Sequence, residues 1–273
     1  MIRSVALATV AAFAAACATI PAAPKVETLR VMTYNIQYGH EGLDSVIDVI
    51  KSEKPDIVGL QEVDVHWSER SNFVDQADLV AKGTAMNYRF ARIYQLPNAD
   101  PSKPPREFGV ALLSRYPITS YTNHVITRLS TQQENPTPQP LPGFLEATVD
   151  VNGTRVRVFD VHLDYRRDPA VRAQQVADML RYVGDMSTPS VMFGDMNANP
   201  DAPELRPLFQ KFRDTWQYAQ DSGWTMPAKK PVGKIDYVLT SNHFRAIKAW
   251  VPHVYASDHF PVVADLSFNT GSR

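Results

Sequence analysis

The sequence predicts an α/β fold in which two β-sheets form the core and helices cover them. Three observations support this fold class. Apolar runs of strand length alternate with amphipathic segments from residue 29 onward, strands outnumber helices, and no internal repeat is apparent. Hydrophobic residues make up 44% of the 273 residues, so we expect a globular chain with a substantial core.

The expected strands are short runs of apolar residues that end in polar or turn-forming residues. Val191, Met192 and Phe193 form one such run, and residues 155–163 show the alternation of a strand with one buried face. The full set covers residues 29–34, 57–60, 110–113, 145–151, 155–163, 191–193, 235–239, 244–250 and 262–268.

Two helices and one long loop complete the expected elements. Apolar residues from Leu43 to Ile50 recur at helical spacing, and Pro55 ends that helix. Pro169 suits the first turn of a second helix, whose apolar residues lie between positions 171 and 183. Residues 130–142 contain four prolines and little apolar content, which indicates a surface loop without a domain boundary.

The first sixteen residues have the pattern of a signal peptide. Arg3 is followed by an Ala-rich apolar stretch, residues 4–16, which is too short to cross a bilayer as a helix. Cys17, the only cysteine of the chain, cannot form an internal disulfide. The small residues before it resemble a bacterial lipobox, although that pattern prefers Leu where Ala14 stands. We therefore expect a lipid anchor at Cys17, with Ala-x-Ala cleavage to a soluble product as the alternative.

This interpretation divides the chain into three parts. Residues 1–16 are the signal peptide, residues 17–27 form a tether with two prolines, and residues 28–270 form one folded domain. We expect an exported protein in the periplasm or outer envelope, attached to the membrane only through a lipid at Cys17. No obligate protein partner is evident.

The net charge limits the classes of partner. The formal charge is −1, and the chain has no long basic block. Proteins that grip duplex DNA through its phosphates need clustered Lys and Arg, so this composition weighs against bulk DNA binding. It does not exclude a small phosphate ester as substrate.

Residues 194–200, Gly-Asp-Met-Asn-Ala-Asn-Pro, are the most informative run of the chain. Asp195 and Asn197 stand two apart at the end of an apolar strand, where alternate residues share a face. A carboxylate there can take a proton from water, and an amide can donate to a developing negative oxygen. Taken alone, the run could equally be an Asx-rich turn that closes the strand.

The same pattern recurs along the chain, because apolar strands repeatedly begin or end beside a group that could bind a metal or phosphate. Each of these residues alone could be a turn cap, a surface acid or a core histidine. Together they would require six strands to carry suitable groups by accident. They are Asn35, Glu62, His162, Asp195 with Asn197, Asp236, and Asp258 with His259.

The ordered motifs resemble those of the endonuclease/exonuclease/phosphatase superfamily of metal-dependent phosphoesterases. They are Thr33-Tyr34-Asn35-Ile36, Leu60-Gln61-Glu62-Val63, Val161-His162-Leu163, Gly194-Asp195-Met196-Asn197, Ile235-Asp236-Tyr237 and Ser257-Asp258-His259. The resemblance runs from residue 29 to residue 268. It implies a four-layered α/β sandwich, with two mixed β-sheets packed face to face and helices outside.

The resemblance also implies roles. Glu62 would be the main ligand of a hard divalent cation, Mg²⁺ with Mn²⁺ as the alternative, and Asn35 and Asp258 would complete that site. Asp236 would hold His259, which contacts the phosphate or acts as acid and base.

For the attack itself, Asp195 would orient or deprotonate the attacking water. Asn197 and His162 would donate to the phosphoryl oxygens as negative charge builds up. The reaction would be an in-line attack by water, without a covalent intermediate.

Two positions depart from the family pattern. Val110 stands where many relatives carry Asn, which would remove one polar contact near the site. Gln37 stands where nuclease relatives often carry an acid that assists metal binding.

The substrate is open at this level, and loops after the strands offer candidate contacts. Arg70 and Arg166 could grip a phosphate in a forked geometry, or they could be solvated loop charges. Trp224 and the pair Lys229-Lys230 are weaker candidates.

We expect an exported hydrolase of a phosphate ester, with a phosphodiester as the preferred class. Phospholipids, nucleic acids and small phosphodiesters are the candidate substrates. The alternatives are an extracellular nuclease and a non-catalytic binding scaffold of the same fold.

Overall fold

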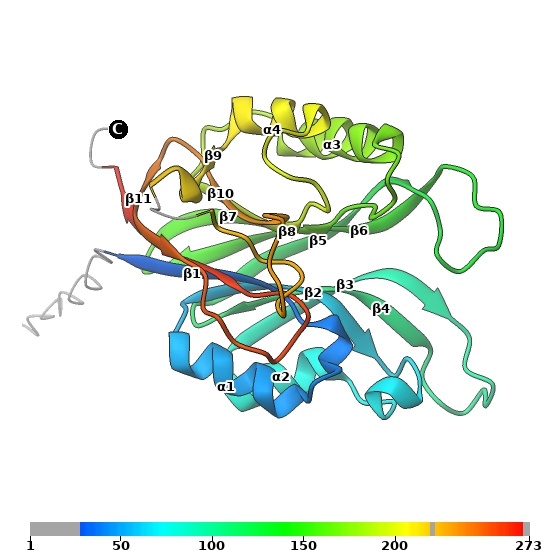
Figure 1. The fold of residues 1–273 in the computed structure, drawn as a ribbon. Helices are drawn as coiled ribbons and strands as arrows, with labels where there is room; N and C mark the ends of the chain where they lie inside the picture. Colours follow the sequence, from blue (N-terminus) through cyan, green and yellow to red (C-terminus); the bar gives the residue numbers. More distant parts are fainter. Residues whose placement is uncertain (1–27, 219–221, 270–273) are drawn as a thin grey trace, which may run out of the picture.

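The computed structural model describes residues 28–218 and 222–269. Two mixed six-stranded sheets pack face to face, with helices α1 and α2 outside the first sheet and α3 and α4 outside the second (Figure 1). This arrangement is the predicted four-layered α/β sandwich. The proposed signal peptide, the tether and Cys17 lie outside the described residues.

The first sheet has the strand order β11-β12-β1-β2-β4-β3. Its strands are β1 (Leu29–Asn35), β2 (Ile57–Val65), β3 (Asn87–Leu96), β4 (Arg106–Ser114), β11 (Phe244–Trp250) and β12 (Val262–Phe268). Helices α1 (Leu43–Glu53) and α2 (Gln76–Thr84) cover its outer face.

The second sheet has the strand order β5-β6-β7-β8-β10-β9. Its strands are β5 (Ile118–Arg128), β6 (Gln139–Val151), β7 (Thr154–His162), β8 (Ser190–Asp195), β9 (Arg213–Asp214) and β10 (Asp236–Thr240). Helices α3 (Ala170–Val183) and α4 (Arg206–Lys211) cover its outer face.

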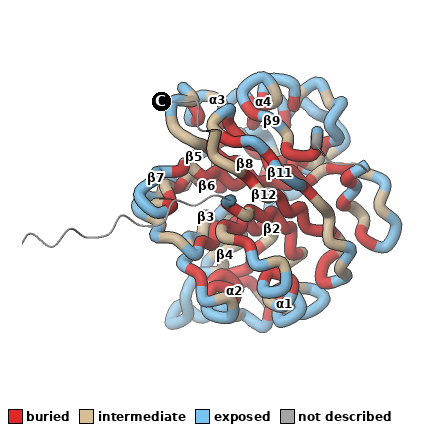
Figure 2. The backbone as a smooth tube through the Cα atoms, turned by 90° about the vertical axis from the view of Figure 1, so that its left-hand side faces the viewer, coloured by how far each residue is buried: buried red, intermediate tan, exposed pale blue. Residues whose placement is uncertain are grey.

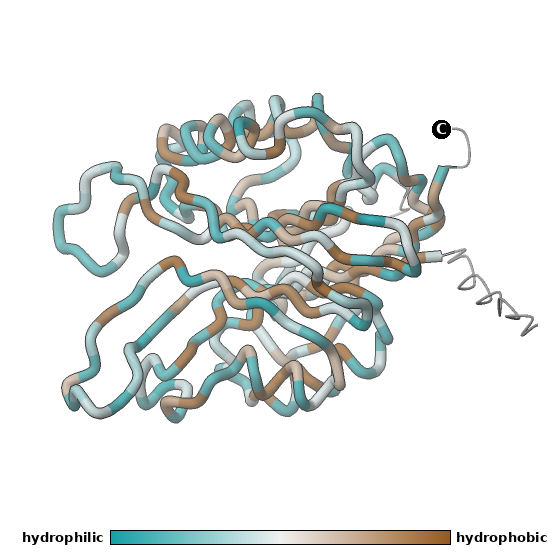
Figure 3. The backbone as a smooth tube through the Cα atoms, turned by 180° about the vertical axis from the view of Figure 1, so that it is seen from behind, coloured by the Kyte–Doolittle hydropathy of each residue, from teal (hydrophilic) through white to brown (hydrophobic). Residues whose placement is uncertain are grey.

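The apolar side chains fill three interfaces between these four layers. One cluster lies between the sheets and includes Val31, Leu112, Leu145 and Phe193. The other two clusters lie between each sheet and its helices. Figure 2 shows the buried segments along the central strands, and Figure 3 shows hydrophobic segments gathered in the same layers. Burying this apolar area is the main favourable contribution to folding.

The expected strands and helices are present, and several extend further than the sequence suggested. The loop expected at residues 130–142 is shorter, because β6 begins at Gln139 despite its prolines. Val110 is fully buried in the cluster between the sheets, so this departure from the family pattern lies in the hydrophobic core.

A chain of polar side chains crosses the core between the two sheets. Gln61 on β2 donates to Asp160 on β7 over 2.6 Å and bonds to the hydroxyl of Thr33 on β1 over 3.1 Å. All three side chains are fully buried. They tie the sheets together directly beside Glu62.

Among the described residues, every helix is too short or too polar to cross a membrane.

Candidate active site

The candidate site forms where both sheets present the same edge. The end of β1 lies beside β2, which runs parallel to it, and beside the segment before the antiparallel β12. In the second sheet, β7 and β8 are parallel, and β10 starts where β8 ends. His162 and Asp236 are therefore both paired with Asp195 in the strand register. Folding thus brings the predicted residues at the ends of separate strands to one place.

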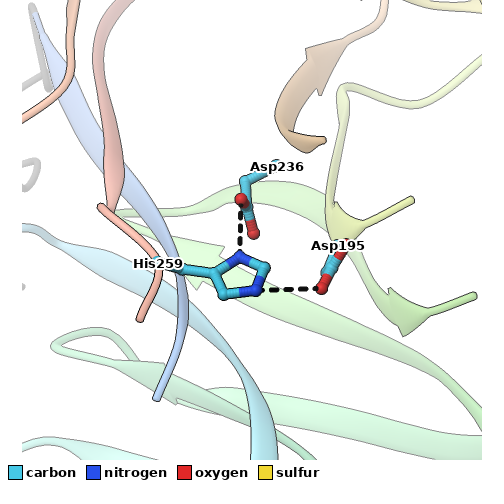
Figure 4. Close-up of side chains that lie close together, drawn as sticks. All are labelled: Asp195, Asp236 and His259. Atoms are coloured by element: carbon cyan, nitrogen blue, oxygen red, sulfur yellow. Dashed lines mark hydrogen bonds and ion pairs between the residues drawn. The ribbon is translucent and has the colours of Figure 1, made fainter. Parts of the chain in front are cut away.

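His259 lies between two buried aspartates (Figure 4). Its Nδ1 is 2.9 Å from Oδ2 of Asp236, and its Nε2 is 3.8 Å from Oδ2 of Asp195. The same Asp236 oxygen accepts the hydroxyl of Thr225 at 2.5 Å. Burial alone would lower the pKa of His259, but the negative charges of Asp236 and Asp195 raise it to about 10. The imidazole therefore carries a proton at neutral pH.

Asp195 is the centre of the polar cluster. Its side chain is 2% exposed, and its Oδ2 accepts the amide of Asn35 at 3.0 Å and lies 3.5 Å from Nε2 of His162. Burial and the charge of Asp236 raise the pKa of Asp195 above its usual value. The residue before it, Gly194, has no room for a side chain, because a Cβ there would lie 2.8 Å from the carbonyl oxygen of Val161.

Asn35 links the two sheets at the site. Its Nδ2 donates to Asp195 over 3.0 Å and to Oε1 of Glu62 over 3.1 Å, while its Oδ1 accepts the backbone N–H of Gln37. The hydroxyl of Ser257 donates to the backbone carbonyl of Asn35 over 2.7 Å, which docks the segment that carries His259. Asn35 therefore positions both carboxylates.

Glu62 sits at an irregularity within a strand, whereas the sequence predicted that it follows a strand end. β2 continues to Val65, and its pairing with β4 shifts register between Leu60 and Val63. Glu62 has a φ of 57°, in the left-handed region that non-glycine residues rarely adopt. Such a bulge redirects one side chain out of the alternation, which here turns Glu62 toward His162, with 4.0 Å between Oε1 and Nε2.

The donor set suits a hard divalent cation. Glu62 and Asp258 are partly exposed carboxylates, and burial together with the charge of Glu62 raises the pKa of Asp258. A cation between them would relieve that repulsion, and oxygen ligands are those that Mg²⁺ prefers. Asn35 turns its NH₂ group toward Glu62, so its Oδ1 could reach a cation only after the amide turns over.

A second set of possible ligand atoms lies deeper in the site. One atom each of Asp195, Asp236 and His259 lie within 4.8 Å of one another. This set is a poor cation site while His259 is protonated, because imidazolium has no free lone pair. Its geometry suits proton transfer.

Asn197 lies near the cluster, but it lies in a turn and does not share a strand face with Asp195. β8 ends at Asp195, and Asn197 adopts a φ of 48° in the turn that follows. Its backbone N–H donates to Oδ1 of Asp195 over 2.9 Å, and its Nδ2 donates to the carbonyl of Leu163 over 3.1 Å. One amide hydrogen is thus used to fasten the turn, and the other is available to a ligand.

Comparison with known proteins agrees with this geometry. The model of the Endonuclease/Exonuclease/phosphatase family matches residues 32–259, which span β1 to His259. The chain belongs to this family. Its members hydrolyse phosphate esters and generally depend on divalent metals.

Individual relatives are distant. Phospholipase C of Staphylococcus aureus is 25% identical over 198 residues, which cover 57% of this chain and 59% of the phospholipase. The chain therefore matches only about three fifths of that enzyme. The uncharacterized protein YbhP of Escherichia coli K12 is 25% identical over 267 residues, 88% of this chain and 96% of YbhP.

Among solved structures, a family member from Beutenbergia cavernae superposes with a TM-score of 0.70 at 24% identity. The match covers 89% of this chain and 72% of that one. At this level of identity the likeness establishes the fold alone.

The present structure has a pocket of about 360 Å³ beside the polar cluster around Asp195. Glu62 and His162 form part of its wall, so the pocket is continuous with the site. Other parts of the wall are aromatic, with Trp67 and Tyr94 on either side of Phe108. An apolar and aromatic wall with a few polar groups is typical of a small-molecule pocket.

Arg70 lines the pocket but is bound to the protein. Its guanidinium makes a forked pair with the fully buried Asp64, at 2.9 and 2.8 Å. It also stacks over the ring of Tyr38, 4.1 Å from the centroid. The side chain is 37% exposed, so part of it remains accessible from the solvent.

Arg166 lies beside the pocket rather than in its wall. It pairs with Asp164, a residue of the pocket wall whose side chain is buried. Trp224, Lys229 and Lys230 are exposed and also lie outside the pocket wall. The structure therefore brings Arg70, and not Arg166, to the pocket.

Two residues of the site were not predicted from the sequence. Thr225 bonds to Asp236, but it follows no predicted strand. Arg128 lines the pocket and donates to the carbonyl of His162 over 2.9 Å, yet its strand, β5, was not predicted. No motif marks either position.

Proposed function

We propose that this protein is an exported, Mg²⁺-dependent phosphodiesterase that cleaves its substrate by in-line attack of water. The observation that carries the proposal is the buried contact of His259 with Asp236 and its approach to Asp195, at the edge where Glu62 and His162 also meet. Membership of a family of phosphate-ester hydrolases supports the reaction class.

Asp195 is the residue that orients and deprotonates the attacking water. Its raised pKa makes it a stronger base than an exposed aspartate, and the amide of Asn35 fixes its carboxylate. The Nε2 atoms of the protonated His259 and of His162 lie 3.8 and 3.5 Å from its Oδ2. They can donate to phosphoryl oxygens as negative charge develops in the transition state.

His259 depends on Asp236 for its charge and orientation. Nδ1 donates to Asp236, so Nε2 presents its proton toward the reacting centre. The hydroxyl of Thr225 fixes the same carboxylate oxygen. This leaves a positively charged donor for the phosphoryl group or the departing oxygen.

The metal would be held by Glu62 and Asp258, with Asn35 in support, and Mn²⁺ is the alternative to Mg²⁺. When bound, it supplies positive charge that offsets the charge on the phosphoryl group and the leaving oxygen. Oxygen ligands without cysteine favour these ions over structural zinc.

Export follows from the N-terminal pattern, with residues 1–16 as signal peptide, 17–27 as tether and a lipid at Cys17. In the periplasm or outer envelope, the enzyme would meet phospholipids and scavenged phosphodiesters. The distant similarity to a phospholipase C is consistent with a phospholipid substrate. Mass spectrometry of the mature N-terminus tests the anchor: a mass without diacylglycerol on Cys17 would rule it out.

An extracellular nuclease is the second candidate, and the formal charge of −1 weighs against it for duplex DNA. A non-catalytic scaffold is the third, and the intact cluster of acids and histidines weighs against it. Measurements of Mg²⁺ binding and of hydrolysis distinguish the scaffold, which should show neither, from both enzymes.

The test uses bis(4-nitrophenyl) phosphate with excess Mg²⁺, then phospholipids, RNA and DNA. We expect Asp195→Ala and His259→Ala to lose about 10²-fold or more in kcat while their circular dichroism stays native. Turnover retained by either folded variant would contradict the mechanism. If the unaltered protein hydrolyses none of the diesters, the proposed function is wrong.

A further inference from the structure

The pocket beside the catalytic cluster contains two polar groups that the proposed reaction does not use. They are Arg128, the last residue of β5, and Gln175, on α3. Both side chains line the pocket and both are almost fully buried, with residue exposures of 5% and 1%.

Arg128 is a buried cation without an ion-pair partner, and the negative charge that acts on it is that of Asp164, which Arg166 already binds. Its guanidinium donates to three backbone carbonyls, those of Pro142, His162 and Gly143, at 2.9 to 3.0 Å. Over residues 28–218 and 222–269, no carboxylate comes within ion-pair distance of it. Burial lowers the pKa of Arg128 to about 10, so the group stays charged at neutral pH. Three carbonyls satisfy hydrogen bonds, but they do not neutralise a buried charge.

Gln175 has a donor without a partner. Its Oε1 accepts the backbone N–H of Asp164 over 2.9 Å, which fixes the direction of the amide. Its Nε2 is buried and meets no hydrogen-bond acceptor in the described part of the chain. Buried amide donors are nearly always paired, so this donor, on a residue of the pocket wall, leaves a hydrogen bond to be filled by an accepting atom of a ligand or of a water.

Two other charged groups of the pocket wall are paired within the protein: Asp164 is bound by Arg166, and Arg70 is bound by Asp64. Glu62 also lines the pocket, where its carboxylate belongs to the proposed metal site. Away from that metal site, the wall retains the positive charge of Arg128 and the donor of Gln175.

We propose that the pocket binds a second oxyanion of the substrate, a phosphate or carboxylate on the organic part of the ester, through Arg128 and Gln175. The guanidinium uses three of its five N–H groups for the carbonyls, which leaves two for this anion. This assignment of substrate class rests on the proposed function, because the reacting phosphate would lie at Glu62 and His162.

Three chromogenic diesters test the subsite: butyl 4-nitrophenyl phosphate and its analogues with a terminal phosphate or a terminal carboxylate on the butyl chain. A charge-assisted contact predicts a kcat/KM about 10- to 100-fold higher for at least one charged analogue than for the butyl ester. The two charged analogues distinguish phosphate from carboxylate. Equal kcat/KM for all three diesters would overturn the proposal.

Gln175→Glu is the decisive variant, because Arg128→Gln would also remove three bonds that hold the fold. The glutamate keeps the acceptor for the N–H of Asp164 and replaces the free donor by an anionic oxygen. In this variant we expect the ratio of kcat/KM for the charged analogue to kcat/KM for the butyl ester to fall to about one or below. Gln174→Glu, the same change at the exposed neighbouring position, should keep it. An advantage that survives Gln175→Glu would overturn the proposal.

A binding measurement separates this inference from the proposed function. If no diester is hydrolysed, calorimetry in EDTA compares 1,4-butanediphosphonate with butylphosphonate. We expect about tenfold tighter binding of the diphosphonate by the unaltered protein and no such difference for Gln175→Glu. Equal affinities in the unaltered protein would again overturn the second anion site.

Discussion

The imidazole of His259 donates from Nδ1 to Oδ2 of Asp236 across 2.9 Å, inside a site where both side chains are nearly excluded from solvent. This pair joins the start of β10, in the second sheet, to the segment before β12, in the first. This hydrogen bond therefore favours the charged form of the histidine and also connects the two sheets at the site.

Asp236→Asn should lower the pKa of His259 from about 10, because Asp236 is the largest of the influences that raise it. A histidine with a raised pKa stabilises the folded protein fully below its unfolded value, near 6.5, and loses that contribution as the pH rises through 10. The variant should lose this stabilisation at neutral pH. Titration of the histidine side chains by NMR in EDTA measures the shift, and an unchanged His259 would contradict the assignment.

Glu62→Gln should weaken Mg²⁺ binding by about tenfold or more, because it removes one of the two partly exposed carboxylates, Glu62 and Asp258, whose negative charges act on each other. Calorimetric titration with Mg²⁺ measures the affinity. Removal of the metal by EDTA should abolish hydrolysis by the unaltered protein, and Mn²⁺ should restore it.

Glu69→Gln is the matched control for this prediction, since Glu69 is exposed on the loop that follows β2. It should leave the affinity unchanged. Equal Mg²⁺ affinities for Glu62→Gln and Glu69→Gln would move the metal site away from Glu62.

Arg70→Gln should destabilise the protein by about 1–3 kcal/mol, because it leaves the carboxylate of Asp64 buried without its partner. The half-exposed position of Arg70 keeps the effect below that of a fully buried pair. Urea unfolding gives the free energy. The double variant with Asp64→Asn should recover part of the loss, and strict additivity of the two single effects would contradict the pairing.

That Asp195, Asp236 and His162 lie together was predictable, because these residues lie in strands with continuous apolar runs. Val191 to Phe193 fixes the position of Asp195 at a strand end, and residues 235–239 do the same for Asp236. Parallel and antiparallel neighbours then bring these ends together. Local pattern and topology agree at this edge of the sheets.

The pocket was not predictable, since part of its wall, including Tyr94 and Arg128, comes from two strands without such runs. β3 and β5 are the edge strands of their sheets, and both carry many exposed polar residues that hide the apolar alternation. Arg128 lies at the end of β5, so its role follows only from the tertiary structure. The bulge at Glu62 depends likewise on the pairing of β2 with β4.

Asp160→Asn should stabilise the protein at pH 8, by an amount of order 1–3 kcal/mol. Asp160 is fully buried, its Oδ2 has no hydrogen-bond partner, and burial raises its pKa well above the usual value despite the bond from Gln61. An acid whose pKa is higher in the folded state binds its proton more tightly there. Its presence therefore costs stability as the pH rises from about 4, the unfolded value, toward the folded one. Asparagine keeps the acceptor for Gln61 and cannot ionise, so the stabilisation of the variant should shrink as the pH falls toward 5.

Urea unfolding at pH 5 and pH 8 measures the free energy of unfolding of the variant and of the unaltered protein, with the exposed Asp48→Asn as control. A variant less stable at pH 8 than the unaltered protein would mean that the ionised carboxylate of Asp160 is what holds Gln61, and with it the strand that carries Glu62.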